Sequence, residues 1–258
     1  MNVTAFKEAQ EAYSRGDYAR ALQGFTVCTQ ELGDLSAADL SKFYHLIGNC
    51  YIKNGEPANA AKYYQKALDN SSKSRRPALF VNLGTALLHS KEYERALEAF
   101  QAALDYPAYA TPYRAYSGIG AAQLKLGNTT EAGAAYREAA LDPTNPMPAK
   151  ALVNLGVCFM ELGRPADAIV SYETALDFDL DSIAEAKALS NLGQAYMAEG
   201  RVQKAIEAFQ TVIDAGMYEL TPIARHDYEI ALKLKDRLDS KMPGILNRML
   251  AKSAEDGR

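Results

Sequence analysis

Basic and amide side chains recur at two fixed places in successive segments of this sequence. The basic set comprises Lys42, Arg114, Lys150 and Lys187, and the amide set comprises Asn82, Asn154 and Asn191. On a chain whose net charge is −4, a row of cations would attract acidic ligands. An amide has both a hydrogen-bond donor and an acceptor, so a row of amides can hold a peptide backbone without reading its side chains. These residue types predict the binding of an acidic or extended peptide.

Residue patterns for catalysis or for metal binding do not occur. The sequence lacks the GxxxxGKS/T phosphate loop, the GxSxG nucleophile motif and the HExxH zinc motif. Its three histidines, His45, His89 and His226, lie far apart, and none has a cysteine or a carboxylate four residues later. We therefore expect no enzymatic activity, no metal site and no cofactor.

The elements that would position these rows are internal repeats. In each copy a small residue is followed twelve residues later by alanine, and four residues after that by an aromatic residue. The alanines are Ala21, Ala60, Ala96, Ala132, Ala168 and Ala205, separated by 39, 36, 36, 36 and 37 residues. Self-similarity at a step of this size is typical of a stacked repeat array.

Each repeat contains two helical segments separated by a breaker. Small and large residues recur every three or four positions, which is the period of a helix. The breakers are Gly16, Gly55, Gly127, Gly163 and Gly200, with Ser90-Lys91 in the third copy. Glycine supplies the left-handed residue that ends a helix. Because one hairpin cannot bury its apolar face alone, we expect the hairpins to stack, with small residues allowing close approach and aromatic rings filling the space beside them.

The pattern resembles the tetratricopeptide repeat family over roughly residues 2–216, as in the copy that runs from Asn154-Leu155-Gly156 to Ala175. The resemblance implies an all-α fold, a right-handed superhelical solenoid of about six helix-turn-helix repeats. It also implies that the first helix of each repeat lines a concave face. The usual role that it implies is the binding of a peptide or a partner protein.

We expect the solenoid over residues 2–239 and a tail over residues 240–258. The repeat units are predicted at about 2–35, 36–72, 74–108, 111–144, 145–180 and 182–217, and a capping helix with a polar outer face at 221–239. An apolar stripe in the tail predicts a short amphipathic helix, and the last residues are expected to be partly disordered. The stripe consists of Met242, Ile245, Leu246, Met249 and Leu250. It would either pack on the end of the solenoid or dock on another copy of the chain or on a partner.

In the fold that the resemblance implies, the candidate binding residues lie on the first helices and would line one groove. They are Lys42, His45, Asn49, Asn82, Arg114, Lys150, Val153, Asn154, Val157, Lys187, Asn191 and Gln194. Some members of the family hold the terminal carboxylate of a peptide with basic and asparagine side chains of three units. At the matching positions Asn49 and Asn82 keep the family residue and Arg114 keeps the charge, but His45 and Gly118 depart from the pattern. Carboxylate capture, a broader acidic peptide ligand and a merely solvated basic rim therefore all stay open.

Charge and hydropathy bear on the other classes of function. The acidic balance argues against nucleic-acid binding, although Tyr113, Arg114 and Tyr116 keep an RNA-binding array as a minor alternative. No apolar run predicts a signal peptide or a membrane span. The three cysteines lie at apolar positions and should be buried thiols, which suits a cytoplasmic protein. The main prediction is a cytoplasmic protein-interaction scaffold, and the second is a structural subunit that self-associates through its tail.

Overall fold

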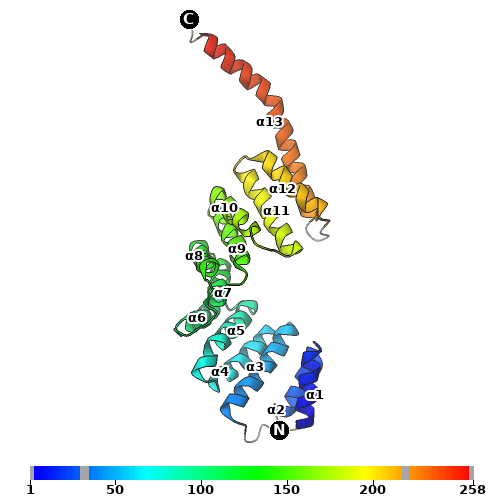
Figure 1. The fold of residues 1–258 in the computed structure, drawn as a ribbon, viewed down its shortest axis with the longest axis vertical. Helices are drawn as coiled ribbons and strands as arrows, with labels where there is room; N and C mark the ends of the chain where they lie inside the picture. The colour runs from blue at the N-terminus through cyan, green and yellow to red at the C-terminus, as the bar shows by residue number, and fades with distance from the viewer. Residues whose placement is uncertain (1–2, 30–34, 217–220, 256–258) are drawn as a thin grey trace. The chain divides into compact units, whose positions relative to one another are not determined.

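The computed structural model describes residues 3–29, 35–216 and 221–255, and the side chains of residues 4–29, 35–216 and 221–241. This part of the chain forms thirteen α-helices and one short 3-10 helix, without a β-strand (Figure 1). The predicted all-α class is therefore confirmed. By their contacts the helices group into two compact units, Met1–Pro146 and Met147–Arg258, which are described in turn.

The first unit contains four helix pairs. The pairs are α1 (Val3–Ser14) with α2 (Tyr18–Thr29), α3 (Ala37–Lys53) with α4 (Pro57–Asp69), α5 (Arg76–His89) with α6 (Tyr93–Leu104), and α7 (Pro112–Lys125) with α8 (Thr129–Leu141). A 3-10 turn, η1 (Lys73–Arg75), directly precedes α5. The second helix of each of the first three pairs also packs on the first helix of the next pair, so the four pairs form a stack.

The second unit contains two helix pairs and a long final helix. The pairs are α9 (Pro148–Glu161) with α10 (Pro165–Leu176) and α11 (Ser182–Ala198) with α12 (Val202–Asp214). Helix α10 packs on α11, and α12 packs on α13 (Thr221–Glu255). Within both units, the stacked helix pairs that the repeats predict are therefore confirmed.

Helix α13 differs from the capping helix expected over residues 221–239. It begins at Thr221, but it continues without a break through Pro243 and Gly244 to Glu255. Proline removes one backbone donor, and that loss alone did not end the helix. The side chains of the predicted apolar stripe, residues 242–250, are outside the described set. The last residues, for which partial disorder was expected, also have no described side chains.

Close packing within the pairs depends on glycine. In five pairs, a Cβ atom added to the glycine of the first helix would lie 2.8 Å or less from an aromatic ring of the second helix. These contacts are Gly48–Tyr64, Gly84–Phe100, Gly120–Tyr136, Gly156–Tyr172 and Gly193–Phe209. All five rings are buried. The first pair reverses the arrangement, because there Gly24 of α2 lies against Ala9 of α1.

The breakers between paired helices adopt the left-handed conformation that the sequence predicts. Gly55 has a φ of 76° between α3 and α4. In the third pair, which lacks a glycine breaker, Lys91 takes this conformation with a φ of 64°. A residue with a side chain adopts it at a cost of roughly 1–2 kcal/mol, so the stack imposes the turn there against local preference.

Candidate functional site

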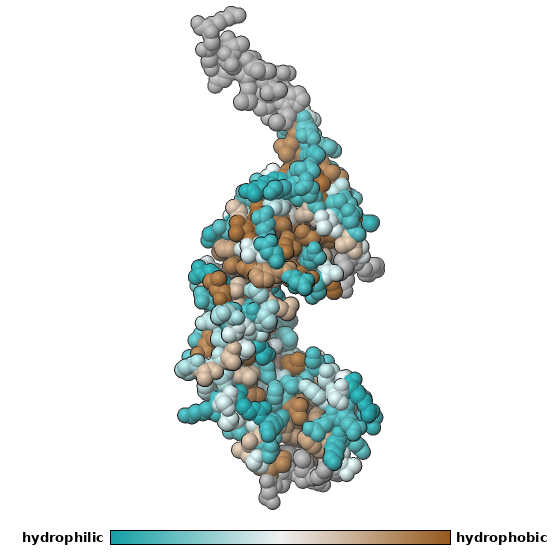
Figure 2. Space-filling view, viewed as in Figure 1, coloured by the Kyte–Doolittle hydropathy of each residue, from teal (hydrophilic) through white to brown (hydrophobic). Residues whose placement is uncertain are grey.

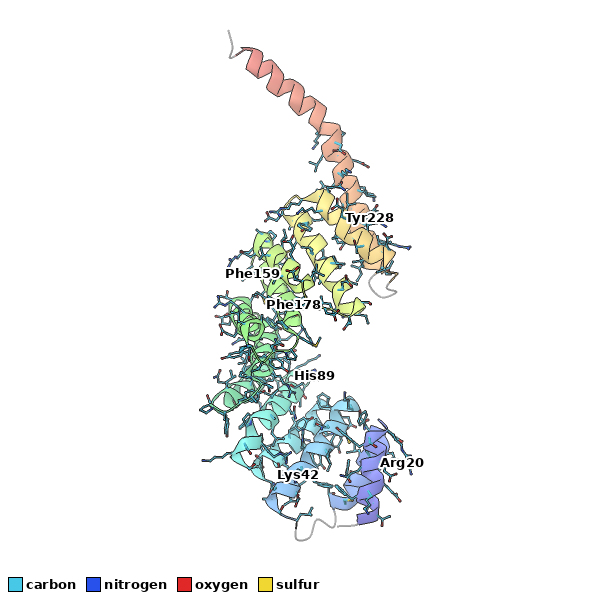
Figure 3. The ribbon with its side chains drawn as sticks, viewed as in Figure 1. Arg20, Lys42, His89, Phe159, Phe178 and Tyr228 are labelled. Atoms are coloured by element: carbon cyan, nitrogen blue, oxygen red, sulfur yellow. The ribbon has the colours of Figure 1, made fainter. Side chains whose placement is uncertain are left out.

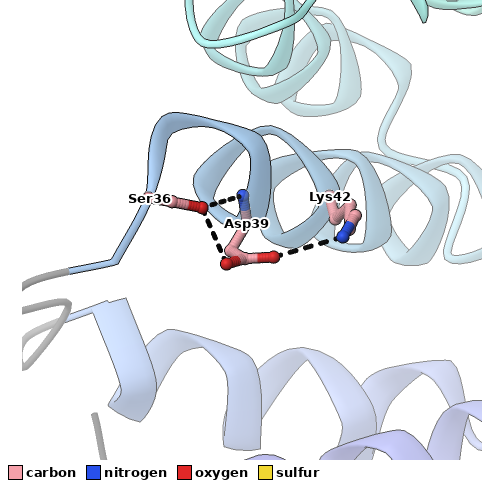
Figure 4. A network of polar contacts seen from close by, with 3 residues as sticks. All are labelled: Ser36, Asp39 and Lys42. Carbon is pink, nitrogen blue, oxygen red and sulfur yellow. Dashed lines mark hydrogen bonds and ion pairs between the residues drawn. The ribbon is translucent and has the colours of Figure 1, made fainter.

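The first basic residue of the predicted row stands at the start of α3. The Ser36 hydroxyl caps the helix by accepting a hydrogen bond from the Asp39 amide at 3.2 Å, and it donates to the Asp39 carboxylate at 2.7 Å. The Lys42 ammonium lies 3.2 Å from the other Asp39 oxygen (Figure 4). The Lys42 side chain is 63% exposed, so this ion pair is weak and leaves the ammonium accessible. Lys42 is labelled on α3 in Figure 3.

His45, one turn further along α3, contacts Asn82 of α5. The Asn82 amide nitrogen lies 2.9 Å from Nε2 of His45, where it donates to a ring nitrogen that carries no proton. Burial, together with the nearby charge of Arg75, lowers the pKa of His45 below its ordinary value. His45 is therefore neutral near pH 7, and it links two successive first helices of the stack.

Arg75 also lies near His45 and Asn82, although the repeat pattern of basic residues does not include it. In the third repeat Ala78 occupies the place where other repeats carry Lys42 or Arg114. Arg75 lies seven residues before Asn82, which is two helical turns and hence the same side of the helix. Its guanidinium is close enough to His45 to lower that pKa, and its Nη1 atom is buried without a hydrogen-bond partner. The same-side spacing from Asn82 is the signal that would have identified it.

Asn49 is already engaged within the protein. Its amide nitrogen donates to the Tyr13 hydroxyl of α1 at 3.2 Å, and its amide oxygen accepts from the Tyr64 hydroxyl of α4 at 2.8 Å. Burial raises the pKa of Tyr64 well above its ordinary range, which keeps this hydroxyl a donor. Asn49 therefore holds three helices together, and both ends of its amide are occupied.

Arg114 stands exposed in the first turn of α7, whose position is fixed by Asp142 at the end of α8. The Tyr113 amide donates to the Asp142 carboxylate at 2.7 Å. The second Asp142 oxygen accepts from the amide and the hydroxyl of Thr144, at 2.8 and 2.7 Å. These hydrogen bonds lower the pKa of Asp142 despite its partial desolvation, so it stays a carboxylate. The start of α7 is held rigidly where it presents Arg114.

A small apolar pocket lies beside Lys42 in the first unit. It has a volume of about 260 Å³ between α1 and α3. Its lining residues are Phe6, Gln10, Leu35, Asp39, Lys42, Phe43 and Leu46. The rings and the aliphatic side chains form most of the wall, and Lys42 with Asp39 supplies the charged edge. The pocket could bury one apolar side chain of a ligand whose neighbouring groups meet Lys42.

The remaining predicted residues lie in the second unit, on α9 and α11. Those on α9 are Lys150, Val153, Asn154 and Val157, and those on α11 are Lys187, Asn191 and Gln194. The two lysines are exposed, whereas the valines and asparagines are half-buried. Gln194 donates from its amide to the Asp227 carboxylate of α13 at 2.9 Å, which ties α11 to the final helix. Val153 packs against the apolar core of this unit.

The histidine, cysteine and acidic side chains of the described residues bear on whether a metal ion could bind. In that part of the chain no three histidine, cysteine, aspartate or glutamate side chains come together as a metal cluster. Cys28, Cys50 and Cys158 are all buried, which confirms the expectation from their apolar positions. Burial raises the pKa of Cys50 to about 11, so it is a poor nucleophile. None of the helices in the described ranges is long and apolar enough to cross a lipid bilayer.

Two family models of the tetratricopeptide repeat match this sequence. One covers residues 148–216, and the other covers residues 45–113 and 81–146. A search of curated proteins finds no match.

Several solved structures share the arrangement of helices. The C-terminal part of a TPR repeat-containing protein from Cytophaga hutchinsonii is 19% identical, with a TM-score of 0.64 over 81% of this chain and 78% of that one. PilF of Pseudomonas aeruginosa is 16% identical, with a TM-score of 0.65 over 88% and 94%. PilW, described as a widely conserved type IV pilus biogenesis factor, is 19% identical, with a TM-score of 0.67 over 85% and 96%. At these identities the likeness shows the fold alone.

Proposed function

Because this chain belongs to the tetratricopeptide repeat family, a family of protein-interaction scaffolds, we propose that its first unit binds an acidic, extended segment of a partner protein. The binding face would be the side of α3, α5 and α7 that carries Lys42, Arg75 and Arg114. The observation that supports this proposal most strongly is the uncompensated charge of that face. In the described residues neither Arg75 nor Arg114 has an ion-pair partner, and Nη1 of Arg75 is buried and unsatisfied.

The buried Nη1 donor of Arg75 has no acceptor, which is unfavourable, and pairing with an acidic ligand would lower this cost. Leaving such a group unpaired costs about 1–3 kcal/mol, and more when it is charged. If the half-buried Arg75 side chain turned its guanidinium outward, a ligand carboxylate could pair with it and recover this free energy. Cationic side chains on a protein of net charge −4 also give the face a sign opposite to that of the whole chain. That contrast favours acidic partners at this place.

The pocket beside Lys42 adds an apolar requirement to the ligand. A leucine-sized or phenylalanine-sized side chain that left water for this pocket would contribute about 1.5–3 kcal/mol. The proposed ligand is therefore an extended segment with aspartate or glutamate residues and one apolar residue near its acidic part. The size of the pocket, about 260 Å³, suits one such side chain and not a folded element.

Capture of a terminal carboxylate alone is the weaker form of the proposal. That mode would need amide groups that are available to the ligand, but Asn49 is occupied by Tyr13 and Tyr64. Asn82 is occupied by His45. The basic residues remain available, so side-chain carboxylates along a segment fit the face better than a single chain end.

The test compares the affinity of acidic peptides for matched charge variants of the full chain. We expect Arg75→Gln with Arg114→Gln to weaken the best peptide of an acidic library by at least about tenfold, a loss of 1.4 kcal/mol or more. The control is Lys62→Gln with Arg137→Gln, which removes the same charge from exposed positions on the second helices α4 and α8. Equal weakening in both variants would mean that only net charge matters. Unchanged affinity in the first variant would refute the proposed face.

A further inference from the structure

The final helix occupies the place of the first helix of a seventh pair. It packs on α12 as α11 packs on α10, and it buries Ala224 and Ala231 completely. If Ala231 is aligned with Gly193 of α11, then Arg225 takes the place of Lys187 and Ile230 takes the place of Leu192. Helix α13 therefore keeps the residue pattern of a first helix, but no second helix follows it within the described ranges.

An apolar side chain of α13 that corresponds to a buried position of the earlier first helices is exposed. In four of the six earlier pairs the residue before the small position is apolar and 8% exposed or less, namely Ile47, Leu83, Leu155 and Leu192, whereas Ile119 of the fourth pair is half-buried. The cores that contain Leu83 and Leu192 each include residues of the second helix of the same pair, among them Phe100 and Phe209. Ile230 has the same place but is 45% exposed. Within the described ranges no second helix follows α13 to cover Ile230.

The uncovered side chains form one stripe along α13. At about 100° per residue, Ile223, Ile230, Leu234 and Leu238 fall within an arc of about 80°. Ile223 is 52% exposed and Leu238 is 46% exposed, while Leu234 is half-buried at the edge of the core. Apolar atoms are visible between polar ones along this part of α13 (Figure 2). Leu232 is also exposed, but it lies on the opposite side of the helix.

We propose that this stripe pairs with the same stripe of a second copy of the chain, with the two α13 helices antiparallel. A pairing centred between Ile230 and Leu234 places Ile230 against Leu234 of the second copy, twice by symmetry. The same register places Asp227 opposite Arg237 of the second copy, also twice. Such a self-complementary surface is what a two-fold interface requires. Opposite charges beside an apolar seam select partner and register in paired helices.

The charge pattern is what selects a second copy over an unrelated helix. In this register neither Asp227 nor Arg237 meets a like charge, because each Asp227 faces Arg237 of the other copy, while Ile223 faces Lys241. A parallel pairing would instead place Asp227 beside Asp227 and Arg237 beside Arg237, which is repulsive. The Asp227 carboxylate already accepts from Gln194 of its own chain, and at about 100° per residue it falls within the arc of the stripe, between Leu234 and Leu238.

The experiment measures the oligomeric state of the full chain by sedimentation velocity over a concentration series. We expect a dimer whose dissociation constant rises at least about tenfold in Ile230→Glu. The matched control, Leu232→Glu, adds the same charge on the far side of α13 and should leave the dimer unchanged. Circular dichroism of each variant would check that the helices remain folded.

A charge exchange then tests the register. Arg237→Glu alone and Asp227→Arg alone should each weaken self-association. Mixing the two variants should restore dimers, since each charge then again meets its opposite. A monomeric wild-type chain would overturn the proposal, as would equal effects of Ile230→Glu and Leu232→Glu. Loss of the dimer in Leu246→Glu but not in Ile230→Glu would overturn it in favour of pairing through residues 242–250.

Discussion

The contact between Gly156 and Tyr172 gives the sharpest test of how the helix pairs are held together. In Gly156→Ala, the new Cβ would lie 2.4 Å from Cε1 and 2.7 Å from Cζ of Tyr172 if nothing moved. The Tyr172 ring is 1% exposed, so it has no room to swing away. Overpacking of this kind costs about 1–3 kcal/mol. Alanine is also the better helix former by about 1 kcal/mol, so the net loss should be about 0–2 kcal/mol.

A double-mutant cycle separates these two effects. In a Tyr172→Leu background the ring atoms Cε1 and Cζ are gone, and a flexible side chain takes their place. The same Gly156→Ala change should then stabilise the protein by up to about 1 kcal/mol, because only the gain in helix propensity remains. The expected coupling between the two positions is therefore about 1–3 kcal/mol, the size of the relieved overpacking.

Urea unfolding followed by circular dichroism measures all four proteins of this cycle. Because stacked repeats need not unfold in a single step, the transition midpoints should be compared together with their slopes. Gly156→Ala that stabilises the wild-type background as much as the Tyr172→Leu background would refute the reasoning. That result would mean that glycine is not required for the close approach of α9 and α10.

Three further predictions concern groups whose surroundings are unusual. Because the folded chain holds the pKa of His45 below its unfolded value of about 6.5, the unfolded chain binds this proton first. The free energy of unfolding should therefore fall as the pH drops below about 6.5, and fall less in His45→Gln; equal falls would contradict this. Asp142→Ala should cost about 1–2 kcal/mol, because it leaves the Tyr113 amide without its acceptor. The exposed Asp105→Ala should cost less in the same urea titration, and the reverse order would contradict the assignment. A thiol reagent should label the native protein far more slowly than the unfolded one, since Cys50 is buried with a raised pKa, and fast native labelling would contradict its burial.

The helix pairs were predictable because their determinants are local. The small residue of one helix and the aromatic residue of the next recur at fixed spacing, as in Gly84 and Phe100, and the structure brings them into contact. The break at Ser90-Lys91 was predictable without a glycine, because the repeat places a turn there whichever residue occupies it. The end of the last helix was not predictable in this way, since Pro243 is a local signal that the helix continues through.

The candidate site was predictable only in part, because its contacts join residues that are distant in the sequence. Periodicity places Asn49 on the first-helix side, but it cannot reveal that Tyr13 and Tyr64 occupy its amide. Comparison of equivalent positions also hides Arg75, because it lies three residues before Ala78, which holds the position of the basic residue in this repeat. Its importance follows from geometry, since its charge is close to His45 and its Nη1 atom is unsatisfied.

The most direct test of the proposed binding face is an amide NMR titration of the full chain with an acidic peptide that contains one apolar residue. We predict that the largest shift changes fall on the start of α3, on η1 with the first turn of α5, and on the first turn of α7. The Arg75 guanidinium resonance should shift with them and saturate at the same peptide concentration. Changes confined to the second helices α4, α6 and α8, or an unmoved Arg75 resonance at saturation, would contradict the binding face proposed for this scaffold.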